Sequence, residues 1–253
     1  MKKIIFKLLA ATIFAAGVFI YFYKSKSTLN ENQNLLIVGT NASLPPFEYK
    51  IDGEIVGFEI DLMNAIGKQL QKEIVFKDMA FDSLLVETQS GRINMIAAAM
   101  TPTEQRSRLV FFTKPFLTND PLVAITLAKE SPKSLSDLKG KEVIVNDGYT
   151  AESFMAKQED IILKRLSTPA ESFLALLNGR GYAYVSARSA VQPYFDKYDE
   201  KKFNILTLDT SDSYALAVSK SFPVLFEQIQ TALNELEKNG TLEALKKKWH
   251  LSF

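Results

Sequence analysis

The fold is decided by the stretch Ile93-Asn-Met-Ile-Ala-Ala-Ala-Met-Thr-Pro-Thr-Glu-Gln-Arg106. Its apolar half, 93–99, predicts a buried strand. Thr101 and Glu104 have the spacing of a capping box, and Pro102 suits the first helical position, where its missing N–H is harmless. The stretch therefore predicts a strand that runs directly into a helix, which is the repeating unit of an α/β fold.

This predicted junction also indicates a site for a small anion. A helix N-terminus offers free backbone N–H groups and a partial positive charge. Arg106 adds a planar fork of donors that suits a carboxylate or a phosphate. An ordinary strand-to-helix turn with a surface arginine is the alternative interpretation of the same residues.

Strand and helix patterns alternate on both sides of this stretch. Strands are predicted at 36–39, 54–58, 74–76, 122–127, 142–145 and 182–185, with helices between them. Asp82 is expected to cap the helix that follows it, and Thr150 the helix 151–158. Thr168-Pro-Ala-Glu171 forms a second capping box before the helix 169–178. The order predicts two α/β units, each with a mostly parallel sheet and helices on both faces.

The composition excludes several classes of function. The 253 residues are 47% hydrophobic and 23% charged, as in an ordinary globular protein. A net charge of +1 gives no electrostatic reason to expect a nucleic acid as partner. The absence of cysteine rules out disulfides and thiolate chemistry, and a single histidine, His250, disfavours a multi-histidine metal site or a serine–histidine triad. We therefore expect no metal and no cofactor.

The first 27 residues form a separate segment. Lysines at positions 2, 3 and 7 precede an apolar run from Leu8 to Tyr23, which is the outline of an export signal. The run ends in Phe-Ile-Tyr-Phe-Tyr23 and not in small residues, so an uncleaved membrane anchor is the competing interpretation. Both interpretations place the chain from about residue 30 onward in the periplasm, either free or tethered to the inner membrane.

Four segments follow one another in an order and spacing typical of one protein family. They are Val38-Gly-Thr-Asn-Ala-Ser-Leu-Pro-Pro-Phe-Glu48, Gly57-Phe-Glu-Ile-Asp61, Thr101-Pro-Thr-Glu-Gln-Arg106 and Leu236-Glu-Lys-Asn-Gly-Thr-Leu-Glu-Ala-Leu-Lys-Lys-Lys-Trp249. Through them the chain from Leu35 to Phe253 resembles the family 3 extracellular solute-binding proteins of polar amino acid ABC transporters. The resemblance implies a periplasmic-binding-protein-like α/β fold, in which two hinge strands join lobe 1 (35–119 plus 213–253) to lobe 2 (120–212).

The resemblance also implies a ligand site between the lobes. Arg106 matches the arginine that clamps the α-carboxylate of the ligand. Thr101 and the backbone around Ala99 match groups that meet the ligand's backbone, and Phe81 matches the position that flanks its side chain. The remaining matches are Asn41 and Leu44 in the first binding loop, and Asp147 and Thr150 in the facing loop.

Two positions depart from the family pattern. Leu44 stands where relatives usually have an aromatic residue. Ala187 stands where they have the aspartate that binds the ligand's α-ammonium, and no carboxylate lies between Glu171 and Asp196 to replace it. An ammonium buried without an anionic partner is costly. Either Asp147 takes this role, or the ligand is not a standard α-amino acid and Arg188 favours a second anionic group.

We therefore expect a monomeric, non-enzymatic protein that captures a small carboxylate-bearing solute, above all an amino acid, by hinge closure. It would deliver that ligand to an inner-membrane ABC permease. One alternative is a dehydratase-type enzyme on the same fold that acts on a prephenate-like acid, for which Glu48, Asp147 and Glu152 are the only candidate acids or bases near the cleft loops. Another alternative is a ligand sensor that acts through a separate partner.

Overall fold

The computed structural model describes residues 34–251. Both interpretations of the segment 1–27 lie outside the described residues. Between residues 34 and 251, no helix is long and apolar enough to cross a membrane.

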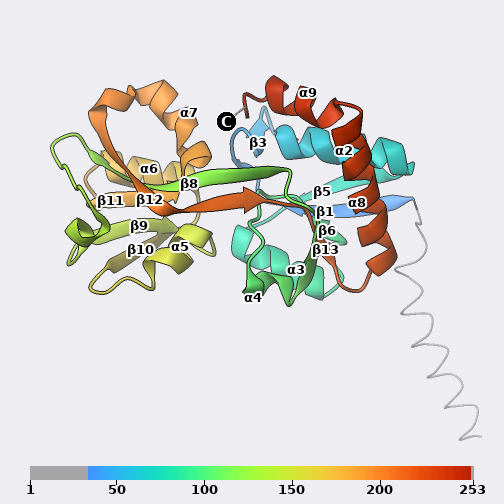
Figure 1. Ribbon diagram of the computed structural model, residues 1–253, viewed down its shortest axis with the longest axis horizontal. Helices are drawn as coiled ribbons and strands as arrows, with labels where there is room; N and C mark the ends of the chain where they lie inside the picture. The colour runs from blue at the N-terminus through green and yellow to red at the C-terminus, as the bar shows by residue number, and fades with distance from the viewer. Residues whose placement is uncertain (1–33, 252–253) are drawn as a thin grey trace, which may run out of the picture. The chain divides into compact units, whose positions relative to one another are not determined.

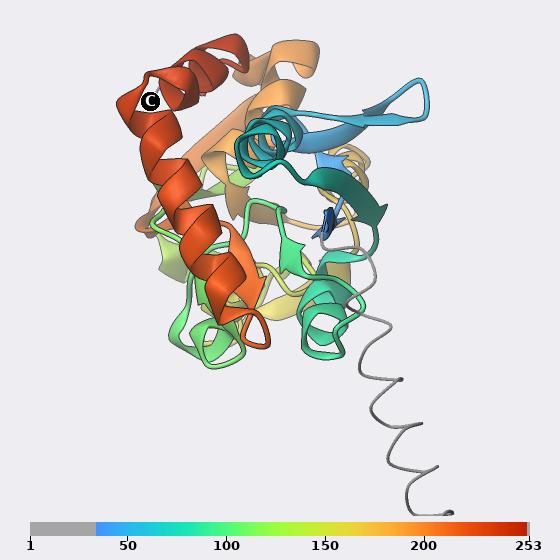
Figure 2. The ribbon, with the colours of Figure 1, turned by 90° about the vertical axis from the view of Figure 1, so that its right-hand side faces the viewer.

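The first of two five-stranded sheets has the order β5-β1-β6-β13-β7. Its strands are β1 (Leu35–Thr40), β5 (Glu73–Asp78), β6 (Met95–Ile96), β7 (Val110–Phe112) and β13 (Ala217–Ser219). β1 runs parallel to β6, whereas β13 is antiparallel to both β6 and β7. The helices α2 (Phe58–Leu70), α8 (Pro223–Lys238) and α9 (Thr241–Lys248) pack against one another beside this sheet (Figure 2). The short helix α3 (Leu84–Gln89) contacts β6, β7 and β13.

The second sheet has the order β10-β9-β11-β8-β12. Its strands are β8 (Leu117–Leu127), β9 (Glu142–Asn146), β10 (Ile162–Leu166), β11 (Ala183–Ala187) and β12 (Phe203–Tyr214). β9, β10 and β11 are parallel, and β8 is antiparallel to its neighbours β11 and β12. The helices around it are α5 (Thr150–Met155), α6 (Pro169–Leu177) and α7 (Arg188–Tyr198), with short 3-10 turns η2 (Leu135–Leu138) and η3 (Glu200–Lys202).

Both sheets are thus mixed but mostly parallel, as predicted, since β13 in the first and β8 in the second run against their neighbours. The chain passes between the sheets as extended strand, from β7 into β8 and from β12 into β13. β8 and β12 lie side by side along most of their length and form the bridge between the two halves of Figure 1. Because β8 and β13 enter their sheets from the opposite side, each adds an antiparallel strand to a parallel set.

A third, small sheet consists of β2 (Ser43–Leu44), β3 (Glu48–Ile51) and β4 (Glu54–Val56). β3 and β4 form a hairpin whose turn residues Asp52 and Gly53 both have positive φ, 52° and 88°. Gly57, immediately after β4, has φ 140°, and a Cβ atom there would lie 2.1 Å from the carbonyl oxygen of Phe47. Only glycine therefore allows the start of α2 to approach the chain before β3 so closely.

The strand and helix in the stretch from Ile93 to Arg106 differ from their prediction. The strand is reduced to β6, and the helix is the single turn α4 (Glu104–Ser107). Its N-cap is Thr103, whose Oγ1 accepts a hydrogen bond from the Arg106 N–H at 3.2 Å, so the capping box predicted at Thr101 was wrong. Thr101 and Pro102 lie ahead of the helix, and Thr101 is free to serve the site described below.

The other predicted caps have mixed outcomes. Asp82 lies inside the 3-10 turn η1 (Phe81–Ser83), and α3 begins after Ser83 without a side-chain cap. Thr150 is the first residue of α5 and not its cap, which is Tyr149. The capping box before α6 is confirmed, since Thr168 and Glu171 exchange both hydrogen bonds.

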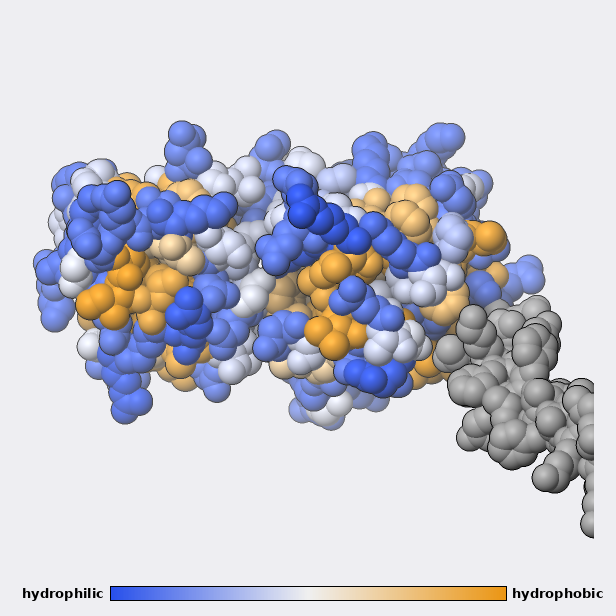
Figure 3. Space-filling view, turned by 90° about the horizontal axis from the view of Figure 1, so that it is seen from below, coloured by the Kyte–Doolittle hydropathy of each residue, from blue (hydrophilic) through white to orange (hydrophobic). Residues whose placement is uncertain are grey.

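The surface is largely polar. The large hydrophobic side chains most exposed to solvent are scattered over different elements, among them Val86 on α3, Ile162 on β10 and Val224 on α8. Figure 3 shows hydrophobic residues in separate patches that hydrophilic side chains border. The dominant apolar packing is instead internal, where the largest buried cluster contains residues of both five-stranded sheets.

Candidate functional site

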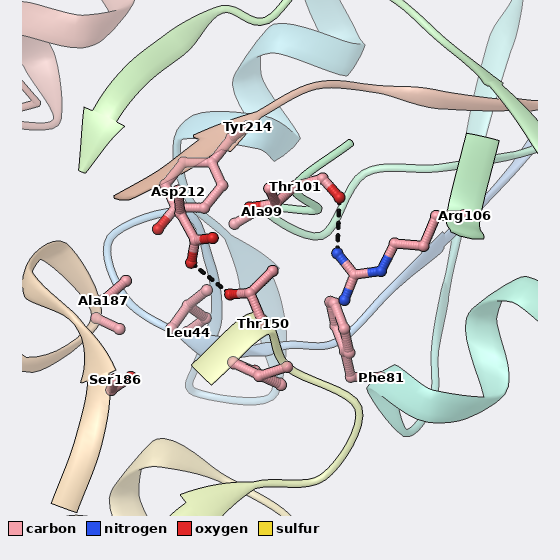
Figure 4. A pocket seen from close by; sticks show the side chains of 12 residues that line it. Leu44, Phe81, Ala99, Thr101, Arg106, Thr150, Ser186, Ala187, Asp212 and Tyr214 are labelled. Atoms are coloured by element: carbon pink, nitrogen blue, oxygen red, sulfur yellow. Dashed lines mark hydrogen bonds between the residues drawn. The ribbon is translucent and has the colours of Figure 1, made fainter. Parts of the chain in front are cut away.

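A cavity lies where loops from the two sheets face each other beside the crossing strands (Figure 4). Its lining residues are Leu44, Phe81, Ala99, Thr101, Arg106, Tyr149, Thr150, Ser186, Ala187, Ala190, Asp212 and Tyr214. The centre of a water molecule can reach about 20 Å³ of this space, which is room for about one water. In this conformation the cavity therefore has little free space.

Arg106 supplies the positive charge of the cavity. Its side chain leaves the one-turn helix α4 and is only 8% exposed. One guanidinium nitrogen, Nη1, donates to the carbonyl oxygen of Thr101 at 2.7 Å, and Nη2 donates to that of Gly148 at 2.8 Å. The guanidinium also lies over the ring of Phe81, 5.4 Å from its centroid. Burial lowers the pKa of Arg106, and the charge of Asp212 opposes this shift.

Asp212 supplies the negative charge. It lies near the end of β12, is 6% exposed, and accepts a hydrogen bond from the Thr150 hydroxyl at 2.7 Å. Burial raises the pKa of Asp212, while the hydroxyls of Thr150 and Thr101 and the charge of Arg106 act in the other direction. The carboxylate therefore stands in a buried site among hydroxyl groups, with its counter-charge across the same cavity.

A second buried carboxylate braces the crossing strands behind the cavity. Asp120 on β8 lies opposite Asp212 on β12 in the strand register. It accepts hydrogen bonds from the Tyr214 hydroxyl at 2.5 Å, from the Ser189 backbone N–H at 3.1 Å and from the Ser189 hydroxyl. These contacts tie β8, β12 and the start of α7 together and fix the Tyr214 ring in the cavity wall.

Ala187, the position where the family resemblance implies an aspartate, also lies in the cavity wall. Ala187, at the end of β11, lines the cavity beside Ser186, whose buried hydroxyl has no hydrogen-bond partner within residues 34–251. Arg188 forms an ion pair with Glu200 at 2.6 Å and lies over the Phe195 ring, 5.1 Å from its centroid. The suggestion that Arg188 serves an anionic part of the ligand therefore finds no support in this arrangement.

The structure brings together six of the eight residues selected from the sequence: Leu44, Phe81, Ala99, Thr101, Arg106 and Thr150. Asn41 and Asp147 are not in the cavity wall. The Asn41 side chain instead stiffens its own loop, since it donates to the Met79 carbonyl at 2.9 Å and accepts from the Ser43 hydroxyl at 2.7 Å. The ligand-binding roles of all eight residues stay predictions.

Sequence reasoning did not select Tyr149, Ser186, Ala190, Asp212 and Tyr214. Asp212 is the most important of them, because it is the one lining carboxylate in the described part of the chain. Its signal was its position as the last residue of the predicted lobe 2 (120–212), where the chain was expected to return to lobe 1. Within residues 34–251, no group of three or more His, Cys, Asp or Glu residues could hold a metal ion.

Comparison with known proteins gives a consistent result. The model of the bacterial extracellular solute-binding proteins, family 3, matches residues 36–252. The arginine-binding extracellular protein ArtP of Bacillus subtilis (strain 168) is 31% identical, and the match covers 98% of each chain. An ancestral arginine-binding protein solved with bound arginine is 35% identical with a TM-score of 0.80, over 86% of this chain and 98% of that one. Its structure with bound glutamine gives 36% and 0.79 over the same shares.

These matches confirm the predicted periplasmic-binding-protein-like α/β fold. The relatives are named as binding proteins, and this chain, like them, is not an enzyme, so the dehydratase-type alternative is set aside. The matched range includes both sheets and every lining residue of the cavity. The chain therefore belongs to the bacterial extracellular solute-binding proteins, family 3.

Proposed function

We propose that the protein binds an α-amino acid in the cavity of Figure 4 and delivers it to an ABC transporter in the membrane. One observation carries this proposal. Of the described lining residues, only Arg106 and Asp212 are charged, and they carry opposite charges. An α-amino acid is a zwitterion, so it offers each buried charge its complement within one small molecule.

Arg106 would bind the α-carboxylate. Its guanidinium is already held by the carbonyl of Thr101 and by stacking on Phe81, so little side-chain freedom is left to lose. A carboxylate is a stronger acceptor for a guanidinium than a carbonyl oxygen, because the hydrogen bonds are charge-assisted on both sides. The ligand would therefore take the place of the Gly148 carbonyl at Nη2.

Asp212 would bind the α-ammonium. The hydroxyls of Thr150 and Thr101 already surround its carboxylate and hold it on the cavity side of β12. A bound ammonium would favour the ionised form and so oppose the effect of burial. In this proposal Asp212 takes the role that the family resemblance assigns to position 187, and the ligand remains a standard α-amino acid.

Arginine is the first candidate ligand, because several relatives are named for it. Glutamine is the second, because the ancestral arginine-binding protein was also solved with it. The wall offers no second carboxylate for a guanidinium, and Leu44 offers no aromatic face for it. A comparison of these two amino acids, equal in their α-groups and different in side-chain charge, therefore tests the side-chain preference directly.

Ligand entry would require the two sheets to separate. The cavity has room for about one water, and two hydrogen bonds span it, from Arg106 to Gly148 and from Thr150 to Asp212. We propose that β8 and β12 act as the hinges between lobe 1 (35–119 plus 213–253) and lobe 2 (120–212). The protein would work as a monomer in the periplasm, free or tethered by its N-terminal segment.

Thermal unfolding of the purified protein tests ligand binding. Ligand at a hundred times its Kd stabilises a protein by about 2.7 kcal/mol, which corresponds to a rise in Tm of roughly 5 to 10 °C for a domain of this size. We expect this response to arginine or glutamine and not to dicarboxylates, and a loss of it in Arg106→Ala. The proposal fails if no amino acid stabilises the protein, or if Arg106→Ala responds like the wild type.

Uptake of the radiolabelled amino acid by cells with and without the gene tests delivery. If the protein delivers the amino acid to a transporter, uptake should fall in cells that lack the gene. Unchanged uptake by cells whose protein binds the amino acid in vitro would favour the sensor alternative.

A further inference from the structure

We propose that Glu59 is a positioning residue for the ligand site: from the buried start of α2 it holds the backbone of Ala99 in the conformation that forms the cavity wall. The inference rests on the proposed function, because it assigns a role toward the ligand of that same cavity. It concerns a side chain that does not line the cavity itself.

The contact between the two residues is direct and buried. Glu59 is the second residue of α2 and is 0% exposed. Its Oε1 accepts a hydrogen bond from the Ala99 backbone N–H at 2.6 Å, although the residues are 40 positions apart in the chain. The N–H is itself buried, so without this acceptor it would be left unpaired in the interior, which is rare in folded proteins.

Ala99 needs an external partner because its backbone conformation is unfavourable. Its φ is 44°, in the left-handed region that L residues other than glycine, asparagine and aspartate seldom adopt. The backbone is tethered on both sides of this point, by a bond from the Ala97 N–H to the Gly39 carbonyl and by one from the Ala215 N–H to the Met100 carbonyl. Such a conformation persists only where the surroundings impose it. At Ala99 itself, the carboxyl group of Glu59 supplies that restraint.

The position of Ala99 makes the restraint relevant to the ligand. Ala99 and Thr101 both line the cavity, and Thr101 is in hydrogen-bonding reach of both charged groups of the cavity. A turn of the Ala99 backbone toward a relaxed φ would displace Thr101, and with it the carbonyl that orients Arg106. Glu59 therefore acts on the ligand through Ala99 and Thr101.

The surroundings of Glu59 keep its carboxyl in place. The backbone N–H of Glu59 donates to the Phe47 carbonyl at 2.9 Å, which is the close approach that Gly57 allows. Glu48 on β3 is the neighbouring acid and is 1% exposed, and the Oε2 atoms of both carboxyls have no hydrogen-bond partner in the described chain. Tyr149, whose buried hydroxyl also has no partner there, lies within the field of Glu48.

Calorimetric titration of the full-length protein with arginine and with glutamine tests the role of Glu59. We expect Glu59→Ala to weaken binding at least tenfold, because the Ala99 N–H loses its acceptor. Glu59→Gln keeps a side-chain oxygen in the same place and should stay within about threefold of the wild type. Met63→Ala is the matched control: it removes a fully buried side chain from the same helix, so it should lower Tm without changing Kd.

Two results would overturn the inference. One is wild-type affinity in a folded Glu59→Ala protein, and the other is a Glu59→Gln protein as weak as Glu59→Ala while Met63→Ala binds normally. If the wild type binds neither amino acid, the proposed function fails instead, and the contact is judged by a measurement that needs no ligand. The amide resonance of Ala99 should then shift with pH in the wild type as Glu59 titrates, and should not shift in Glu59→Gln. A flat titration of this amide in the wild type contradicts the assignment.

Discussion

At the scale of single residues, the charge arrangement of the cavity sets the expected chemistry. Arg106 and Asp212 face one cavity, and the wall at Ala187, on the neighbouring strand β11, is neutral. The negative charge thus sits on a crossing strand, β12, and not on the strand β11 that ends at Ala187. An acid near the end of a crossing strand lies at the junction of the two sheets, so it suits a ligand that both sheets must hold.

We expect Asp212→Asn to lower the affinity for the amino acid by roughly 10- to 100-fold, because a hydrogen bond to a charged group contributes about 1.5 to 3 kcal/mol. The fold should be retained, since asparagine still accepts the Thr150 hydroxyl. Calorimetric titration measures the effect. If Asp212→Asn binds like the wild type, the ammonium lies elsewhere.

Adding Ala187→Asp to that variant provides the matched test. The new carboxylate would enter the wall of the same cavity, so the double variant should recover part of the lost affinity. Recovery would show that the acid can come from either strand. Its absence, together with a folded protein, would mean that the position on β12 itself matters.

The sequence allowed Arg106 to be selected, because an arginine next to a helix start has a recognisable chemistry whatever the rest of the fold. Asp212 could not be selected in the same way. Its significance depends on the pairing of β12 with β8, which brings residues about 90 positions apart together. The alanine at position 187 was informative, because the absence of the expected aspartate implies that another acid binds the α-ammonium.

At the scale of elements, the start of α2 and the strand β3 bury two carboxyls together. Burial raises the pKa of Glu59 to about 8, from 4.5, and burial followed by repulsion from Glu59 raises the pKa of Glu48. An acid whose pKa is higher in the folded state binds more protons there than when unfolded. Its contribution to stability is therefore complete below the unfolded pKa and is lost as pH rises through the folded pKa.

We consequently expect the stabilising effect of Glu59→Gln to grow with pH. The variant cannot ionise, so its Tm relative to the wild type should rise by several degrees between pH 5 and pH 8. Thermal unfolding at the two pH values measures this difference. An equal difference in Tm at both values would mean that Glu59 titrates as it does in the unfolded chain.

The elements that the sequence predicted well are those with local signals. The helix α6 has a capping box at Thr168 and a glycine of positive φ after its end, at Gly179. Both signals lie within a few residues of the helix ends in the sequence. β12 was missed because its second half, Asp209-Thr-Ser-Asp-Ser213, is polar and has low strand propensity. Only its partner strand β8 makes it extended, and long-range pairing leaves no local pattern.

At the scale of the whole described chain, the two sheets should move relative to each other when ligand binds. The protein has no cysteine, so pairs of spin labels can be attached at chosen sites without removing native thiols. Val86 and Ile162 are both 58% exposed. Val86 lies on α3, which packs on the first sheet, and Ile162 lies on β10 of the second sheet. We expect the distance distribution between labels at these sites to become shorter and narrower with saturating amino acid.

Labels at Val86 and Val224 are the control, because both positions lie on helices beside the first sheet and should keep their distance. If the two sheets close on the ligand, only the distance between the labels at Val86 and Ile162 should change. If both pairs change, the ligand alters the first lobe itself. If neither changes, β8 and β12 are not hinges.

The strand order of the first sheet has a consequence for the making of the protein. β13 is formed by residues 217–219, yet it lies between β6 and β7, which come from the first half of the chain. The second sheet needs only residues 117–214, so its strands can pair while the first sheet still has a gap between β6 and β7. The first sheet, and with it the support for the cavity wall that carries Arg106, is therefore complete only once residues 217–219 have joined β6 and β7.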